Sequence, residues 1–442
     1  MEEERKRKNA EQIDDKDYIL NFGHFLPLSV VRSLNVSKKI DLFAMDEDGF
    51  DFSPADLLFT LAYTKILRLL SEEETNPAMY GVSTFTDEEM LGGLEFLGSC
   101  YQEIMEVMND SLGHIHKRKM KRCFFNYSDF YLKNELQHRE LMLLLDSESI
   151  PMWMERKKEN QNTSADISEF IKDAKGNLRS PIRVIEVLNE SSLKSANIVD
   201  VINRKDGYIF LKSNKSASEE ELTWALPDDK WTNHLDKNGY LRYCTRFRIV
   251  KKEYSYKSQE GKTMRVSVPE KQVVMYKPSR TLGLEMGIFN NAPLFNKYQF
   301  LSTSETDMTD EEIYESYLQG MDTIQAFQDM DTEYSAEPNF MSRTDFVNGN
   351  LLSSYVAVML VRVIQNCLFK SIYTPEEIVD YLQKFKVLDR QDGTYINLMR
   401  RSEATIGEEL NESFSLPTLN RFIDGKDRKD LFSFTFSSQD LK

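Results

Sequence analysis

The segment that most constrains the fold is the aromatic run Cys123-Phe-Phe-Asn-Tyr-Ser-Asp-Phe-Tyr131, which alternates roughly as a β-strand does. A basic stretch from Lys117 to Arg122 leads into it, and the polar pair Lys133–Asn134 follows it. The run therefore predicts a strand. Asn126 lies in its middle with aromatic residues on both sides, where a polar side chain is most often a hydrogen-bonded core amide.

Composition limits the class of protein and its partners. A chain of 442 residues with 40% hydrophobic content is long enough for two or three domains with sizeable cores. The net charge of -16 is unexpected for a protein that holds long stretches of nucleic acid, although a local basic face is compatible with it. The four cysteines are far apart and form no CxxC pair, which predicts neither a zinc ribbon nor a disulfide framework and fits a reducing cytoplasm. The charged N-terminus does not resemble a signal peptide, and the apolar run Leu351–Ile364 contains Arg362 and predicts a buried helix, so no membrane is expected.

Hydrophobic periodicity predicts an α/β fold with a mixed sheet. We expect a charged tail at 1–17, a helical N-terminal domain at 18–115, an α/β core at 116–213 and 298–388, a β-rich insertion at 214–297 and a polar, poorly patterned C-terminal tail at 389–442. Within the insertion, alternating residues predict four short antiparallel strands: Tyr240–Ile249, Glu253–Tyr256, Met264–Val268 and Gln272–Tyr276. Ser53 before Pro54, and Thr374 before Pro375, predict helix starts. Further helices are expected at the C-terminal side of the core.

Several short segments, in this order and spacing, resemble bacterial DDE transposases of the insertion-sequence-four-like superfamily. They are Asn21–Leu26, Phe124–Ser128, Ile150–Pro151 with Asn162–Ser164, Gly207–Phe210, Glu270–Tyr276, and Thr309–Ile313 with Tyr317. The resemblance implies an RNase H-like core with a helical region before it and a β insertion ahead of the last catalytic carboxylate. It also implies two-metal phosphoryl transfer on DNA, for which two Asp and one Glu hold divalent metal ions.

The positions that match the family's catalytic residues are neutral in this sequence. The first Asp falls at Asn126 and the second at Asn189. The family's helical signature (Tyr, two residues, Arg, three residues, Glu, six residues, Lys) begins at Tyr317 and gives Gly320, Ile324 and Asp331 in place of Arg, Glu and Lys. An amide brings no charge to offset two divalent ions, and an isoleucine cannot ligate a metal. The resemblance therefore implies a pseudoenzyme, with no metal site and no cofactor; Mg²⁺ is implied only if the protein is active.

Three nearby carboxylates are the candidates for replacing the lost ones. Asp129 and Glu186 each lie three residues from a triad position, hence on the opposite face of a regular strand. Glu190 follows Asn189 directly and is the true match if the register slips by one residue.

Two groups of cations are candidates for contacts with DNA phosphates: Lys117, Arg118, Lys119, Lys121 and Arg122 before the aromatic strand, and Arg246, Arg248, Lys251 and Lys252 in the β insertion. A solvated turn and a solvated sheet face explain them equally well.

Three functions remain open. The first is a transposase-like protein that keeps the fold, and with it DNA or protein binding, but has lost strand cleavage. The second is an active DNA transposase that uses displaced carboxylates. The third is an acidic interaction scaffold that does not bind DNA. DNA and a second copy of the chain are the candidate partners.

Overall fold

The computed structural model describes residues 19–45, 50–67, 85–118, 121–131, 138–157, 163–178, 181–189, 195–212, 218–225, 231–235, 239–257, 262–276, 298–331 and 344–441. The chain divides into two compact units. The first unit comprises Met1–Arg118, Tyr131–His138 and Ala326–Lys442, and the second comprises Lys119–Phe130 and Arg139–Gln325. Each unit is described by itself.

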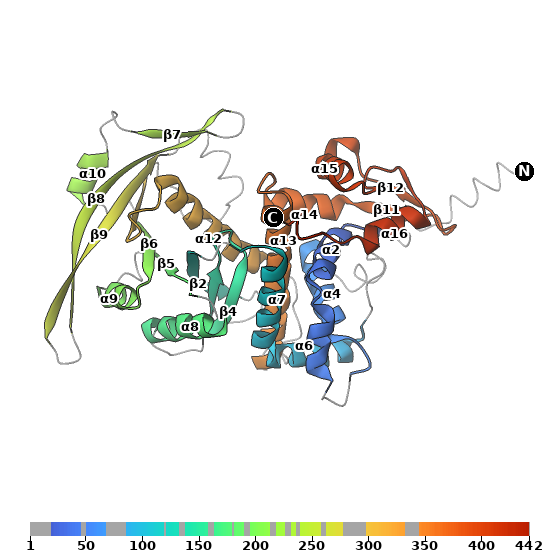
Figure 1. The fold of residues 1–442 in the computed structure, drawn as a ribbon, viewed down its shortest axis with the longest axis horizontal. Helices are drawn as coiled ribbons and strands as arrows, with labels where there is room; N and C mark the ends of the chain where they lie inside the picture. The colour runs from blue at the N-terminus through green and yellow to red at the C-terminus, as the bar shows by residue number, and fades with distance from the viewer. Residues whose placement is uncertain are drawn as a thin grey trace, which may run out of the picture. The chain divides into compact units, whose positions relative to one another are not determined.

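The second unit is built on a nine-stranded sheet with the order β4-β3-β2-β5-β6-β10-β9-β8-β7 (Figure 1). β2 pairs with β5, and β5 with β6, in parallel, whereas β6 pairs with β10, and β10 with β9, antiparallel. The mixed sheet predicted from the sequence is therefore confirmed. The strands are β2 Cys123–Tyr131, β3 His138–Leu145, β4 Pro151–Lys157, β5 Val184–Asn189, β6 Gly207–Lys212, β7 Thr232–Leu235, β8 Leu241–Lys257, β9 Thr263–Tyr276 and β10 Tyr298–Thr303.

The order β4-β3-β2-β5-β6 is that of an RNase H-like core: three consecutive strands, followed by two that return in parallel through helices. α8 (Thr163–Asn177) connects β4 to β5, and α9 (Ser195–Asn203) connects β5 to β6. Such crossovers are required because parallel neighbours cannot be joined by a tight turn. The β insertion does not form a sheet of its own: β10 lies between β6 and β9 and extends the core sheet into β9, β8 and β7.

The four short strands predicted for the insertion are two long ones, β8 and β9, which pair without interruption from Cys244–Tyr276 to Lys257–Thr263. Pro269 interrupts the sequence pattern but not the strand. β10 pairs with β9 only from Lys271 onward, so Pro269 lies opposite Lys251 where β9 has one described neighbour, the edge setting in which strands tolerate proline. From the pair Lys251–Pro269 to the pair Lys257–Thr263, β8 and β9 form a two-stranded ribbon, which is visible in Figure 1.

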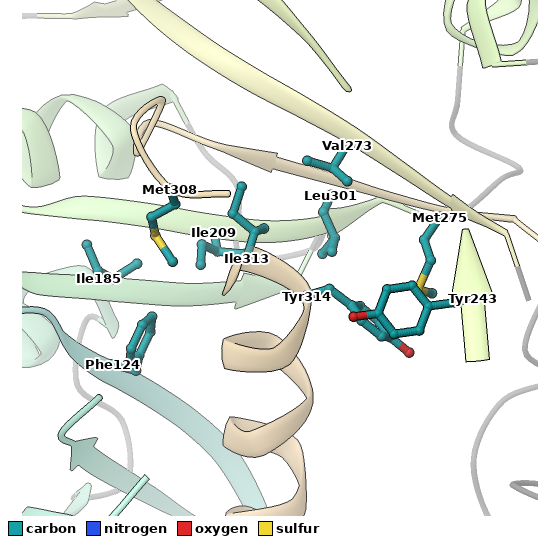
Figure 2. Packing of buried hydrophobic residues seen from close by; sticks show 10 residues of the cluster. All are labelled: Phe124, Ile185, Ile209, Tyr243, Val273, Met275, Leu301, Met308, Ile313 and Tyr314. Carbon is teal, nitrogen blue, oxygen red and sulfur yellow. The ribbon is translucent and has the colours of Figure 1, made fainter. Parts of the chain in front are cut away.

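Both faces of the sheet are covered by helices. α12 (Asp310–Asp331) packs Ile313 and Tyr314 on one face, against Phe124, Ile185, Ile209, Val273 and Leu301 (Figure 2). On the other face, α9 packs on Tyr208, Tyr254 and Val268, and α10 (Glu219–Ala225) packs on Val274 and Phe300. The cluster that includes Tyr254 and Val268 anchors the ribbon, because a two-stranded hairpin alone is only marginally stable.

The first unit is mainly helical. Its helices are α2 Phe25–Leu34, α3 Ser37–Asp41, α4 Pro54–Leu67, α6 Asp87–Ser99, α7 Tyr101–Ile115, α13 Thr344–Val363, α14 Pro375–Lys384, α15 Thr405–Phe414 and α16 Gly425–Ser433. The predicted starts are confirmed: the Ser53 hydroxyl accepts from the Asp56 N–H at 3.0 Å, and Thr374 forms a capping box with Glu377.

The apolar run Leu351–Ile364 lies in α13, whose side chains are buried almost throughout. Thr344–Leu368 is long and apolar enough to cross a membrane by length and composition, but 89% of its most apolar window is buried inside the protein. This is the environment of a core helix. Gly98 of α6 and Gly349 of α13 allow these two helices to meet backbone to backbone, because a Cβ at either position would collide with main-chain atoms of the other helix.

The region after residue 389 contains more regular structure than its weak sequence pattern indicates. β1 (Ile19–Asn21), β11 (Lys386–Asp389), β12 (Tyr395–Asn397) and β13 (Phe422–Ile423) form an antiparallel sheet in the order β1-β11-β12-β13. These strands are two to four residues long. Elements of that length are too short to establish a periodic signal, and their pairing is largely non-local.

Candidate functional site

Asn126 lies on the face of the sheet that α12 covers. It pairs with Val187 of β5, which in turn pairs with Ile209 of β6, and directly paired residues share a face. Val187 and Ile209 belong to the cluster that packs against α12. The Asn126 side chain is 2% exposed, and its Nδ2 has no hydrogen-bond partner among the described residues.

Gly320 of α12 lies directly against this amide. A Cβ added at Gly320 would be 2.7 Å from Oδ1 and 3.2 Å from Nδ2 of Asn126. The absence of a side chain at 320 is thus what allows the helix to lie this close to the amide. Tyr317, Gly320 and Ile324 follow the i, i+3, i+7 spacing of one helix face. Tyr317 packs against the cluster, and burial raises the pKa of its hydroxyl to about 12.

The structure therefore brings together three of the positions predicted from the sequence, Asn126, Tyr317 and Gly320. Ile324 lies one turn further along the same helix face and is half-buried. Asn189 is the last residue of β5, two residues beyond the partner of Asn126. The side chains of Asn189, Asp129 and Asp331 lie outside the described part of the structure, as does Glu190 entirely.

Glu186 lies on the opposite face of the sheet from Asn126. It pairs with Phe125, whose ring packs on Phe170 of α8 at 5.3 Å. Its carboxylate is 3% exposed and accepts from Arg204, which also contacts Asp206 at 3.3 Å. Burial outweighs the attraction of Arg204 and raises the pKa of Glu186 to about 7. The sheet lies between this carboxyl and Asn126, so the two cannot ligate one ion.

The described residues around Asn126 do not fit a two-metal group. They supply one amide, one glycine and one isoleucine, whereas Mg²⁺ requires hard anionic oxygen ligands. Across the described ranges, no group of three or more His, Cys, Asp and Glu side chains is arranged to hold a metal ion. The unpaired Nδ2 of Asn126 is a donor, which a cation would repel.

Two of the four described cations of the first predicted group, Arg122 and Arg118, have protein partners. Arg122 contacts Glu305 at 3.3 Å and Asp307 at 2.5 Å, which raises the pKa of its guanidinium despite burial. Arg118 donates to the side chain of Asn109. Lys117 and Lys121 are exposed, and Lys119 lies outside the described residues.

Arg246 and Arg248 lie against α10 rather than facing open solvent. The guanidinium of Arg248 lies 4.6 Å from the ring centre of Trp224, contacts Glu220 at 3.1 Å and donates to Gln272 at 2.8 Å. Arg246 lies 5.6 Å from the same ring centre. Cation–π contact of this kind holds the helix on the sheet.

The ribbon carries the other two predicted cations of the β insertion, Lys251 and Lys252, together with Arg265. Lys251, Lys252 and Arg265 are exposed, and none forms an ion pair with another described residue. Lys251 lies opposite Pro269, and Lys252 opposite Val268. Among the described residues of β8 and β9, Glu253 is the one acidic side chain that is exposed. The ribbon is therefore locally basic in a chain of net charge -16.

Two features of the site were not predicted. In the sequence, Gly320 was noted only as the position where the resemblance implies an arginine. In the structure, its lack of a Cβ lets α12 lie against the Asn126 amide. The second feature is Glu305, which is buried just before α12 and accepts from both Arg122 and Arg183. Glu305 begins an acidic stretch that runs to Glu315, and the sequence alone does not say which of these acids is buried.

No protein-family model matches the chain, and no curated protein matches it. Among solved structures, the chain is similar to a piggyBac transposase in a cryo-EM structure of its synaptic complex with hairpin DNA, with 9% sequence identity and a TM-score of 0.35. The match covers 92% of this chain and 82% of that one. A likeness of this degree does not define a family.

Proposed function

We propose that this protein is a transposase-like protein of the insertion-sequence-four-like superfamily that binds DNA and no longer cleaves it. The observation that carries the proposal is the contact between Asn126 and Gly320. The family resemblance implies a metal-binding carboxylate at position 126 and an arginine at position 320.

Electrostatics supports the loss of cleavage. The Asn126 side chain is buried, and among the described residues it presents an unpaired N–H donor and meets a glycine, where a cation would need anionic oxygens. The nearest buried carboxyl in the neighbouring strand, Glu186, faces the other side of the sheet and is held by Arg204. Both facts argue against rescue from within the described core.

The ribbon supports DNA binding. A two-stranded antiparallel ribbon is a form that enters DNA grooves, and phosphate contacts come from Lys and Arg without anionic partners. Lys251, Lys252 and Arg265 meet that condition, whereas Arg248 and Arg122 are held in ion pairs. We therefore assign the phosphate contacts to the ribbon.

Cleavage is tested with a supercoiled plasmid and with linear duplexes that have free 3′-hydroxyl ends, in Mg²⁺ or Mn²⁺. We expect neither nicking nor strand transfer. Metal-dependent cleavage that disappears in the Glu190→Gln variant would show an active enzyme with a displaced carboxylate, and the proposed loss of activity would be wrong.

Binding is tested by titrating a fluorescent duplex at increasing salt concentrations. The triple variant Lys251→Ala/Lys252→Ala/Arg265→Ala should reduce the slope of log K against log salt by about 2.7, which corresponds to three phosphate contacts. Lys172→Ala, an exposed lysine of α8, is the matched control and should leave the slope unchanged. An equal slope for the triple variant and the wild type would exclude the ribbon, and no binding at all would favour an interaction scaffold.

A further inference from the structure

The small sheet of the first unit has one face packed on the core and one face without a covering layer among the described residues. The inner face carries Val387, Tyr395 and Ile423, all buried, and the ring of Phe22 packs on Tyr395 at 5.2 Å. Phe22 also packs on Phe432 of α16 at 5.1 Å. This side of the sheet is thus closed by α16 and by the segment before α2.

The outer face carries an apolar row across all four strands. Ile19 pairs with Leu388, Leu388 with Ile396, and Ile396 with Phe422, so these four side chains lie side by side. Leu398 extends the row, since its N–H donates to the Lys386 carbonyl at 2.9 Å. Phe422 is 60% exposed and Leu398 is 38% exposed, while the other three are half-buried.

This composition is unusual for a solvated face. An antiparallel sheet with one open face normally places polar side chains there. The row of Ile19, Leu388, Ile396, Leu398 and Phe422 instead forms a contiguous apolar surface, which marks an interaction site.

The margin of the row is cationic. Lys386 and Arg400 are exposed and form no ion pair within the described part of the chain. Lys386 begins β11 and pairs with Asn21, on the face of the row, and Arg400 follows β12. Arg421, in contrast, lies opposite Asn397 and so belongs to the inner face. Arg390 is also nearby in sequence but is paired with Asp392.

We propose that this face binds an acidic amphipathic helix of a partner protein. Adjacent strands are about 4.8 Å apart, so the row spans about 14 Å across four strands. One turn of helix rises about 5.4 Å, so apolar side chains at i, i+3 or i+4, and i+7 would follow the row. Acidic side chains on the flanks of that helix would meet Lys386 and Arg400.

The charge and the geometry select this occupant over two others. A second copy related by a two-fold axis would bring the same cationic margin against itself. An added strand is disfavoured because the edge strand β13 has only two residues.

The probe is a fluorescein-labelled synthetic helix of about four turns, with leucines on one stripe and glutamates beside it, titrated with the full chain and followed by anisotropy. We expect saturable binding of the probe to the wild type. The affinity should be lower by about fivefold or more in Phe422→Ser, because aromatic side chains buried in an interface contribute much of the binding energy. We expect a fall of about tenfold or more, with loss of salt dependence, in Lys386→Glu/Arg400→Glu. Ile372→Ser, 53% exposed in the same unit and outside the row, is the matched control and should bind as the wild type does.

The charge-reversal variant changes only exposed side chains, so it tests the proposal even if Phe422→Ser fails to fold. Absence of saturable binding, or equal affinity in all variants, would overturn the proposal. Dimerisation in sedimentation velocity that Phe422→Ser abolishes would assign the face to a second copy. Displacement of the probe by duplex DNA, with the same sensitivity to the variants, would assign it to nucleic acid.

Discussion

Gly320→Ala tests the contact at the centre of the candidate site. Alanine in a helix interior is favoured over glycine by about 1 kcal/mol. The new Cβ, however, would lie 2.7 Å from Oδ1 of Asn126, closer than real Cβ contacts allow, and overpacking of a core costs about 1–3 kcal/mol. The clash outweighs the helix propensity, so we expect a net loss of up to about 2 kcal/mol in the free energy of unfolding.

The assay follows the second unit alone, because all three tryptophans, Trp153, Trp224 and Trp231, lie in it. Urea unfolding followed by tryptophan fluorescence therefore reports that unit. Gly176→Ala in α8 is the matched control: a Cβ there meets nothing within 4 Å, so this variant should gain about 0.5–1 kcal/mol.

A double-mutant cycle with Asn126→Ala isolates the contact. Asn126→Ala removes the amide that the new methyl group would strike, and it also removes a buried donor without a partner. In that background Gly320→Ala should become stabilising, which gives a coupling of about 1–3 kcal/mol. If Gly320→Ala stabilises the wild type as much as Gly176→Ala does, and the coupling is zero, the assigned contact is wrong.

Three further variants test the electrostatics of the second unit, with tryptophan fluorescence as the readout. Asn126→Asp places a carboxyl in a neutral, buried pocket, which raises its pKa, so we expect a loss of about 2 kcal/mol or more at pH 7 and a smaller loss at pH 4; equal losses would contradict this. Glu186 has a pKa of about 7 when folded, against an ordinary value of 4.5, so the folded state retains a proton that the unfolded chain releases. The stabilisation from protonated Glu186 is therefore fully present below pH 4.5 and is lost as the pH rises to about 7. Over that window, the free energy of unfolding of Glu186→Gln should rise by up to about 3 kcal/mol relative to that of the wild type. A difference between the two proteins that does not change with pH would refute the pKa shift. Tyr254→Phe removes one of two hydroxyls that donate to the buried Glu270 and should cost about 1–3 kcal/mol, whereas Tyr256→Phe, on the same strand, should be close to neutral.

The sequence predicted the parts of the fold that depend on local pattern. The aromatic strand β2, the caps at Ser53 and Thr374, and the buried helix α13 follow from alternation, from capping chemistry and from continuous apolar character. β8 and β9 were predicted as four strands, because the polar Lys251–Lys252 step and Pro269 look like interruptions until the partner strand is known. The small sheet β1-β11-β12-β13 was not predicted, because each of its strands is too short to show a periodic pattern.

The candidate site was predictable only as a set of positions. Spacing placed Asn126 and Gly320 in register with a family signature, but nothing in the sequence says that the glycine lies against the amide. Likewise, Arg246 and Arg248 were selected because they are cations in a β segment. Their engagement with Trp224 and Glu220 depends on where α10 packs, which is a tertiary fact.

The contact between Asn126 and Gly320 also couples the two positions at which the resemblance to DDE transposases implies an aspartate and an arginine. With glycine at 320, α12 lies close enough to β2 for the amide to fill the space beside the helix axis. An arginine at 320 would need that space, so it fits only if the helix moves away from β2 or residue 126 becomes smaller. Asn126→Asp alone would bury a charge without bringing a cation near it, and Gly320→Arg alone would strike the amide. Asn126→Asp and Gly320→Arg are therefore each expected to destabilise the core when made alone, and the metal site that the resemblance implies would require residues 126, 320 and 324 to change together.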